Sequence, residues 1–150
     1  MGQLELDKLT KGASFALDTV VFIYFLERHP IHYSTVKKLF HRIEKAELSA
    51  VISSLVFAEL LVPVYRANDI KRAQTLIHLL TNFPNLQVIS LSSEISAKAA
   101  HLRAIYNLPT PDAIHAATAL TVKTDGIITN DKDFLRLSKD MKVWLLSHID

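Results

Sequence analysis

The 150-residue chain has no cysteine, only three glycines and a single tryptophan. The absence of cysteine excludes disulfide bonds, thiolate nucleophiles and thiolate zinc sites. The longest apolar run, LSAVISSLVFAELLVPV, is interrupted by serines, Glu59 and Pro63 and is short for a membrane-spanning helix. The first residues mix charges and lack the basic and then apolar pattern of a signal peptide. We therefore expect a cytoplasmic protein.

Apolar residues make up 49% of the sequence, which indicates one folded domain with a sizeable core. The formal net charge is only +2. If several acidic residues gather in one pocket, the remaining surface is distinctly basic, which suits a polyanion held near a metal ion. A mildly basic, solvated surface is the simpler interpretation of the same composition.

Short apolar or β-branched runs alternate with segments of helical periodicity along the whole chain. This alternation predicts an α/β fold with a central, mostly parallel sheet of four or five strands. The predicted strands are SFALD (14–18), LSAVIS (48–53), LQVISL (86–91), DGIITN (125–130) and KVWLLS (142–147). The last helix before DGIITN is expected to have Thr110 as its N-cap, Pro111 at its first position and Asp112 at its second.

Four acidic residues fall where such a sheet forms its sites. In open α/β sheets these sites lie beyond the carboxyl ends of the strands. Asp18 ends the first predicted strand, Asp131 follows the fourth, Glu59 lies in the helix after the second, and Asp112 begins the helix before the fourth. We expect these four side chains to converge.

Each acid also has a purely structural interpretation. Asp18 can act as a helix N-cap, which contributes roughly 1 kcal/mol, and Asp112 gains from the helix dipole. Asp131 and Asp133 can be turn residues. Glu59 has only apolar neighbours for a turn on either side, so it needs a partner or a metal ion unless it lies on a narrow solvent stripe with Arg66 nearby.

Carboxylates that gather closely repel one another, and protons or a cation must offset the repulsion. Oxygen ligands without cysteine or a clear histidine cluster select a hard ion, Mg²⁺ or Mn²⁺. Metal-assisted phosphodiester hydrolysis is the chemistry that such a site suits.

Four segments of the chain resemble, in order and spacing, the motifs of PIN-domain proteins, most closely the VapC-type toxins. They are LDTVVFIYFLE, SSLVFAELL, LPTPDAIHAATAL and IITNDKDFLRL. The resemblance divides the chain into an N-terminal extension, residues 1–14, and a nuclease domain, residues 15–150. It implies a three-layer α/β/α fold and a Mg²⁺- or Mn²⁺-dependent single-strand endoribonuclease. It also implies a homodimer that a cognate antitoxin inhibits by covering the cleft.

By position, the acidic site of the family carries onto Asp18, Glu59, Asp112 and Asp131. Thr129 matches a hydroxyl residue that often stands beside the fourth acid, and Asn130 and Asp133 compete with Asp131 for that role. Val20 departs from the family, which often has Asn or Ser there. His115 roughly shares the face of Asp112. It is either a further contact to the site or phosphate or, as we favour, a packed or surface histidine.

Single-stranded or structured RNA is favoured over duplex DNA because the sequence contains no recognition helix or minor-groove arm. Lys37, Lys38, Arg42, Lys71, Arg72 and Lys132 are candidate backbone contacts, although each is more simply a solubility charge. Two other functions compete. The chain can be a catalytically silent PIN-like module that binds RNA or protein, or a phosphorylated receiver, for which the residues after Asp18 fit poorly.

Overall fold

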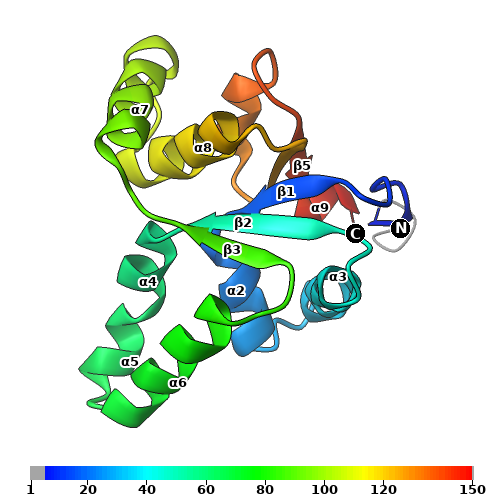
Figure 1. Cartoon of the computed structure of the whole chain (residues 1–150), viewed down its shortest axis with the longest axis vertical. Helices are drawn as coiled ribbons and strands as arrows, with labels where there is room; N and C mark the ends of the chain where they lie inside the picture. Colours follow the sequence, from blue (N-terminus) through cyan, green and yellow to red (C-terminus); the bar gives the residue numbers. More distant parts are fainter. Residues whose placement is uncertain (1–5, 150) are drawn as a thin grey trace.

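The structure is a computed structural model, and it describes residues 6–149. Five parallel strands form one sheet in the order β3-β2-β1-β4-β5. Their bounds are β1 Ser14–Leu17, β2 Ser49–Ser53, β3 Leu86–Ile89, β4 Gly126–Thr129 and β5 Val143–Leu145. Each lies within a predicted strand, and the predicted three-layer α/β/α class is confirmed (Figure 1).

The first face of the sheet is covered by α2 (Thr19–Leu26) and α3 (Tyr33–Glu44), together with part of α6 (Ile70–Thr81). The strands are short but alternate strictly, so Phe15 and Leu17 of β1 pack into this layer while Ala16 faces the opposite one. In α3 the apolar stripe that was visible in the sequence is buried, and the charged residues face outward.

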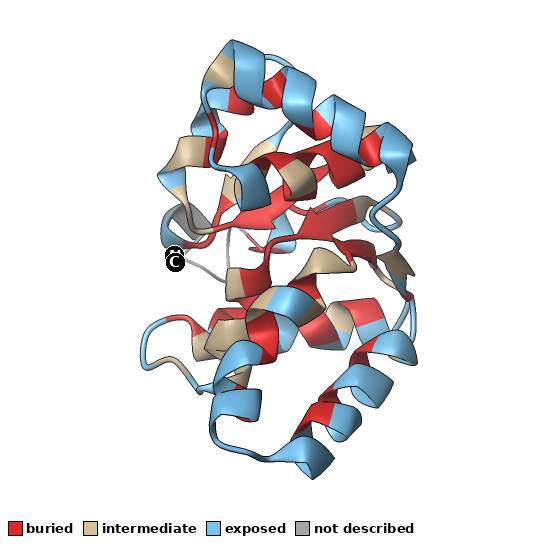
Figure 2. Cartoon of the chain, turned by 90° about the vertical axis from the view of Figure 1, so that its left-hand side faces the viewer, coloured by how far each residue is buried: buried red, intermediate tan, exposed pale blue. Residues whose placement is uncertain are grey.

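The second face is covered by α7 (Ser93–Tyr106), α8 (Thr110–Val122) and the 3₁₀ helix η1 (Lys132–Leu137). Ala113, Ala116 and Ala117 of α8 have no exposed surface, so the alanine run allows this helix to lie close to the sheet. Figure 2 shows the resulting pattern, with buried residues on the strands and on the inward sides of the helices.

A smaller apolar cluster lies beside the main core, where α4 (Leu55–Leu60) and α5 (Val62–Arg66) pack against α6. The sequence predicts one helix here that Pro63 ends or kinks. The structure has two helices joined at Leu61, with Pro63 in the first turn of the second. This arm projects from the sheet in Figure 1 and has exposed apolar side chains, including Tyr65 and Ile70.

Residues before β1 pack onto the domain. Leu6 and Leu9 are buried in the core under α3. The Arg42 guanidinium donates to the carbonyl oxygens of both residues, at 2.8 and 3.1 Å, and pairs with Glu47 at 3.0 Å. Residues 1–5 of the proposed extension lie outside the described residues.

One helix boundary differs from its prediction. α8 begins at Thr110 rather than after it, and its N-cap position is taken by Pro109, which has no side-chain acceptor to offer. Thr110 is therefore not the cap, and Asp112 stands at the third helical position. Among the described residues the longest helix has 14 residues, and none has the length and apolarity needed to cross a bilayer. The last helix, α9, covers Leu146–Ile149.

Candidate functional site

An open cleft of about 620 Å³ lies at the carboxyl edge of the sheet. The cleft lies beside β1, where the direction in which successive strands are added to the sheet changes. β2 and β3 lie on one side of β1, and β4 and β5 lie on the other. Crevices at such reversals are where open α/β folds bind their ligands. Side chains of four separate segments line the cleft: Asp18, Thr19, Val20, Ile23, Tyr24, Glu59, Asp112, Asn130, Asp131 and Lys132.

Asp18 sits directly after β1 and is almost fully buried. One carboxylate oxygen accepts from the Thr19 backbone N–H at 2.7 Å, so the residue does cap α2. The other accepts from the Thr129 hydroxyl at 2.6 Å. Burial raises the pKa of Asp18, while the His115 imidazole and the two hydrogen bonds act in the opposite direction. The cap and the cleft position therefore coexist in one residue.

Glu59 turns into the cleft from α4. Its Oε1 accepts from the Thr19 hydroxyl at 2.7 Å and lies 2.8 Å from His115 Nε2. Burial acts to raise the pKa of Glu59, but the hydrogen bonds from His115 and Thr19 outweigh it and hold the pKa below its ordinary value. These contacts, rather than Arg66, are the partners that the structure gives this carboxylate.

His115 is buried on α8, one turn after Asp112. Its Nε2 also lies 3.2 Å from the Thr19 hydroxyl and 3.6 Å from Asp18 Oδ1. The ring thus lies between the carboxylates of Glu59 and Asp18. The sequence, by contrast, favoured a histidine that is merely packed or on the surface. The helical spacing from Asp112 was the signal for this position.

Asp112 faces a second group of carboxylates. Oxygen atoms of Asp112, Asp131 and Asp133 all lie within 4.8 Å of one another. Burial, the negative charges of Asp131 and Asp18, and a hydrogen bond with Asp131 together raise the pKa of Asp112 to about 7, and His115 acts in the opposite direction. A carboxyl group whose pKa is raised by burial and by neighbouring carboxylates, in a cleft, is typical of a functional site.

The three neighbouring candidates after β4 are placed differently. Asp131 lies in the cleft, and its Oδ1 caps η1 at the Asp133 N–H, 2.9 Å away. Asp133 also pairs with Arg136 at 3.3 Å. Asn130 holds its surroundings together, because its amide donates to the Tyr24 hydroxyl at 2.9 Å and accepts from the Ser147 N–H at 2.9 Å.

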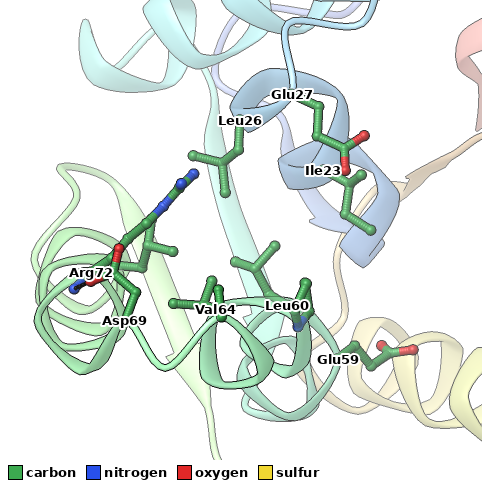
Figure 3. Close-up of a pocket in the computed structure, with 11 residues that line it drawn as sticks. Ile23, Leu26, Glu27, Glu59, Leu60, Val64, Asp69 and Arg72 are labelled. Atoms are coloured by element: carbon green, nitrogen blue, oxygen red, sulfur yellow. Dashed lines mark hydrogen bonds between the residues drawn. The ribbon is translucent and has the colours of Figure 1, made fainter.

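A second cavity, of about 350 Å³, adjoins the cleft and is called the α2–α6 groove here. Its walls are mostly apolar side chains of α2, α4, α5 and α6, with Asp69 and Arg72 at one end. Glu59 and Ile23 line both this groove and the cleft. Figure 3 shows Glu59 at the end opposite Arg72, with its carboxylate directed away from the groove.

The PIN-domain family model matches residues 15–140, and thus includes every acid of the cleft. The chain belongs to the PIN-domain family. The predicted resemblance to this family is confirmed, whereas no curated protein matches the chain.

Solved structures similar to this PIN domain include a VapC toxin and VapBC complexes. It is 21% identical to a chain of VapBC2 from Rickettsia felis bound to promoter DNA, with a TM-score of 0.66 over 87% of this chain and 98% of that one. It is also 21% identical to a chain of VapBC-1 from nontypeable Haemophilus influenzae, with a TM-score of 0.66 over 89% of this chain and 98% of that one. VapC20 of Mycobacterium tuberculosis, described as a sarcin–ricin loop cleaving toxin, is 14% identical, with a TM-score of 0.59 over 75% and 86%. At these low sequence identities, the TM-scores establish a shared fold and nothing further.

Proposed function

We propose that this PIN domain is a Mg²⁺- or Mn²⁺-dependent endoribonuclease that hydrolyses single-stranded RNA. We further propose that it is the toxin of a type II toxin–antitoxin pair. The observation that supports the activity best is the convergence of Asp18, Glu59, Asp112 and Asp131 from four segments on one open cleft. A cap, the helix dipole or a turn explains Asp18, Asp112 and Asp131 singly, but none of these explains Glu59 or the common location of all four carboxylates.

The donor set fits a hard divalent cation. Asp112, Asp131 and Asp133 offer oxygen atoms close enough to share one ion, and the raised pKa of Asp112 shows a repulsion that a cation would relieve. In the proposal Asp18, Asp112 and Asp131 hold the ion, and Asp133 is within reach of it. When bound, the ion supplies charge stabilisation at the scissile phosphate and a more acidic water.

Glu59 is proposed to complete that set or to orient the attacking water. Its lowered pKa keeps the carboxylate ionised at neutral pH, so it acts as an acceptor. His115 and Thr19 both contact Oε1 and thereby fix the orientation of the side chain. In-line attack of water would leave a 5′-phosphate and a 3′-hydroxyl.

Among the predicted RNA contacts, Lys132 is the one that lines the cleft, so it is proposed to bind the phosphodiester backbone there. Arg42 is engaged with the N-terminal segment instead, which makes it a structural residue here. Arg72 lies at the far end of the α2–α6 groove.

An antitoxin segment is proposed to occupy the α2–α6 groove and extend to Glu59, because groove and cleft share lining residues. The structural neighbours include toxin–antitoxin complexes, which supports a partner of this class. Exposed apolar residues on α5 and α6 supply further surface for the antitoxin or for the proposed homodimer. Light scattering of the purified chain tests the dimer.

The activity is tested by incubating the chain with tRNA, rRNA and unstructured RNA in the presence of Mg²⁺, Mn²⁺ or EDTA. Cleavage is expected with either metal ion and not with EDTA. Asp18→Asn and Asp112→Asn should each reduce cleavage to background while circular dichroism stays unchanged. Glu94→Gln, an exposed acid on α7, is the matched control and should retain full activity.

The same assay separates the remaining candidates. Loss of cleavage in Asp131→Asn but not in Asp133→Asn or Asn130→Ala would assign the fourth site group to Asp131. Wild-type chain that binds RNA but does not cleave it with either metal ion would favour the catalytically silent module.

A further inference from the structure

A second polar hollow lies at the opposite edge of the sheet from the catalytic cleft. It encloses about 470 Å³ and is called the lysine hollow here. Its lining includes the residues that stand immediately before β1, β4 and β5, namely Ala13, Asp125 and Lys142, together with Lys8, Lys11, Gly12 and Trp144. Because the strands are parallel, the amino ends that border this hollow and the carboxyl ends that border the cleft are separated by the full length of each strand.

The charge of the lysine hollow is positive. Lys8, Lys11 and Lys142 contribute three ammonium groups, and Asp125 is the one acid among the described residues that line the hollow. The Asp125 carboxylate is engaged with the Ser14 backbone N–H, at 2.8 Å. Lys8 also takes part in another interaction, so the charge balance is made without it. Lys11 and Lys142 still outnumber the one described carboxylate, and an anion that enters meets net positive charge.

The wall of the hollow contains unusual features for a surface lysine cluster. The Lys142 ammonium lies 4.5 Å from the centroid of the Trp144 ring, which holds the charge over the aromatic face. Space is also free beside Gly12, where an added Cβ would meet no atom within 4 Å.

We propose that the lysine hollow is a phosphate-binding site that holds an RNA strand at a point remote from the cleavage cleft. A phosphate fits this cluster, because ammonium groups bind its oxygen atoms as point charges from several directions and need no planar arginine fork. RNA as the source of that phosphate rests on the proposed function. The hollow and the cleft together give the molecule two contact points for one polyanion on opposite edges of its sheet.

The single tryptophan makes this site directly observable, because all tryptophan fluorescence of the chain comes from Trp144. The full chain is titrated in EDTA, at ionic strength matched with chloride, with inorganic phosphate, a nucleoside 5′-monophosphate and a single-stranded oligoribonucleotide. A saturable fluorescence change is expected, and Lys8→Ala/Lys11→Ala should abolish it. Saturation by the small phosphates indicates a terminal-phosphate site, and saturation by the oligonucleotide alone indicates an internal phosphodiester site. No saturable change with any of the three would overturn the proposal.

RNA affinity supplies the second measurement. Lys8→Ala/Lys11→Ala/Lys142→Ala should weaken binding about tenfold at low salt and reduce the slope of log K against log salt by about 2, since each single-strand phosphate contact contributes about 0.7. Lys98→Ala/Lys123→Ala/Lys139→Ala removes the same charge from exposed positions. Its effects on the RNA affinity and on the salt slope should each be less than half as large. Equal losses of RNA affinity in both triple variants would show that the lysines of the hollow act only as general surface charge, and would reject the site. Neither readout needs cleavage, so a chain that binds phosphate here but cleaves no RNA refutes the proposed function alone.

Discussion

Thr129 links the ends of two neighbouring strands with one hydroxyl group. It donates to Asp18 Oδ2 at 2.6 Å and accepts from the Asp131 N–H at 3.1 Å, while its side chain is fully buried. The hydroxyl therefore fixes the acid after β1 relative to the acid after β4 without neutralising either charge. Thr19 does the same for Glu59 and His115. Two threonines thus position the cleft's carboxylates and leave their negative charge available.

The elevated pKa of Asp112 predicts a pH-dependent stability. Its pKa rises from 3.8 to about 7 on folding, so between these values the folded chain binds more protons than the unfolded one. Stability from this residue is present at low pH and is lost as the pH rises toward 7. The Asp112→Asn variant should not lose stability in this way as the pH rises. In EDTA, the melting temperature of the variant should exceed that of the wild type by a few degrees at pH 8 but not at pH 4.

Thermal unfolding followed by circular dichroism at several pH values measures this difference. Glu94→Gln serves as the control, because it removes an exposed charge and should follow the wild-type profile. A variant Asp112→Asn that melts below the wild type at pH 8 would show that the carboxylate stabilises the fold, contrary to the argument.

Residue roles could be predicted from the sequence only in part. Asp18 and Asp112 were noticeable because they stand at the start of apolar helices, and Glu59 because its neighbours are apolar. The contacts of Thr19 could not be predicted, since its partners are 40 and 96 residues away. His115 was undervalued for the same reason: its burial depends on how α8 lies against β1 and α4.

At the scale of elements, the pairing of β4 with β5 depends on the absence of a side chain at Gly126. A Cβ there would lie 2.7 Å from the Lys142 carbonyl oxygen, and that oxygen accepts the ladder hydrogen bond from Ile127. Gly126→Ala should therefore destabilise the fold by about 1–3 kcal/mol. Without this obstacle, alanine in a strand would stabilise it by roughly 0.5–1 kcal/mol relative to glycine.

Urea unfolding gives the free energy for this test. Gly12→Asn is the comparison variant, because Gly12 has a φ of 88° and open space, a conformation that asparagine tolerates. Any side chain is strained at this positive φ, so Gly12→Asn should cost about 1 kcal/mol or less, without the steric clash that Gly126→Ala adds. Unchanged or increased stability of Gly126→Ala would mean that the strands separate without cost.

The type and order of elements were predictable because the periodicity changes from helix to strand at clear positions. The boundary at Thr110 was not, since Pro109 occupies the cap position although it offers no side-chain acceptor. The short helices α5 and α9 were also missed as separate elements, because a few residues carry too little periodicity to define a helix.

At the scale of the whole molecule, the proposed ion should stabilise the fold by mass action. A ligand present at 100 times its Kd adds about 2.7 kcal/mol, which corresponds to roughly 5–10 °C in a domain of this size. Mn²⁺ or Mg²⁺ should raise the melting temperature of the wild type, and more so at pH 8 than at pH 6, because protons compete for Asp112.

The same titration with Asp112→Asn is expected to show little or no shift, whereas Glu94→Gln should respond like the wild type. Equal shifts in all three proteins would place the ion elsewhere. This measurement is independent of RNA, so it tests the metal site without assuming the reaction.

The strand order could not be deduced from the sequence, yet it determines where the cleft lies. β1 and β4 begin more than a hundred residues apart, and the central position of β1 between β2 and β4 is a property of the whole sheet. For the same reason neither the α2–α6 groove nor the lysine hollow was visible in the sequence, because each gathers residues from several distant segments.

That strand order has a consequence for biosynthesis. Asp18 leaves the ribosome more than a hundred residues before its partner Thr129, and β1 cannot acquire β4 as its second neighbour until that part of the chain has also emerged. An incomplete nascent chain therefore lacks the assembled cleft. The proposed activity can therefore arise only once β4 has emerged and paired with β1, and a fragment of the chain that ends before Gly126 should be inactive.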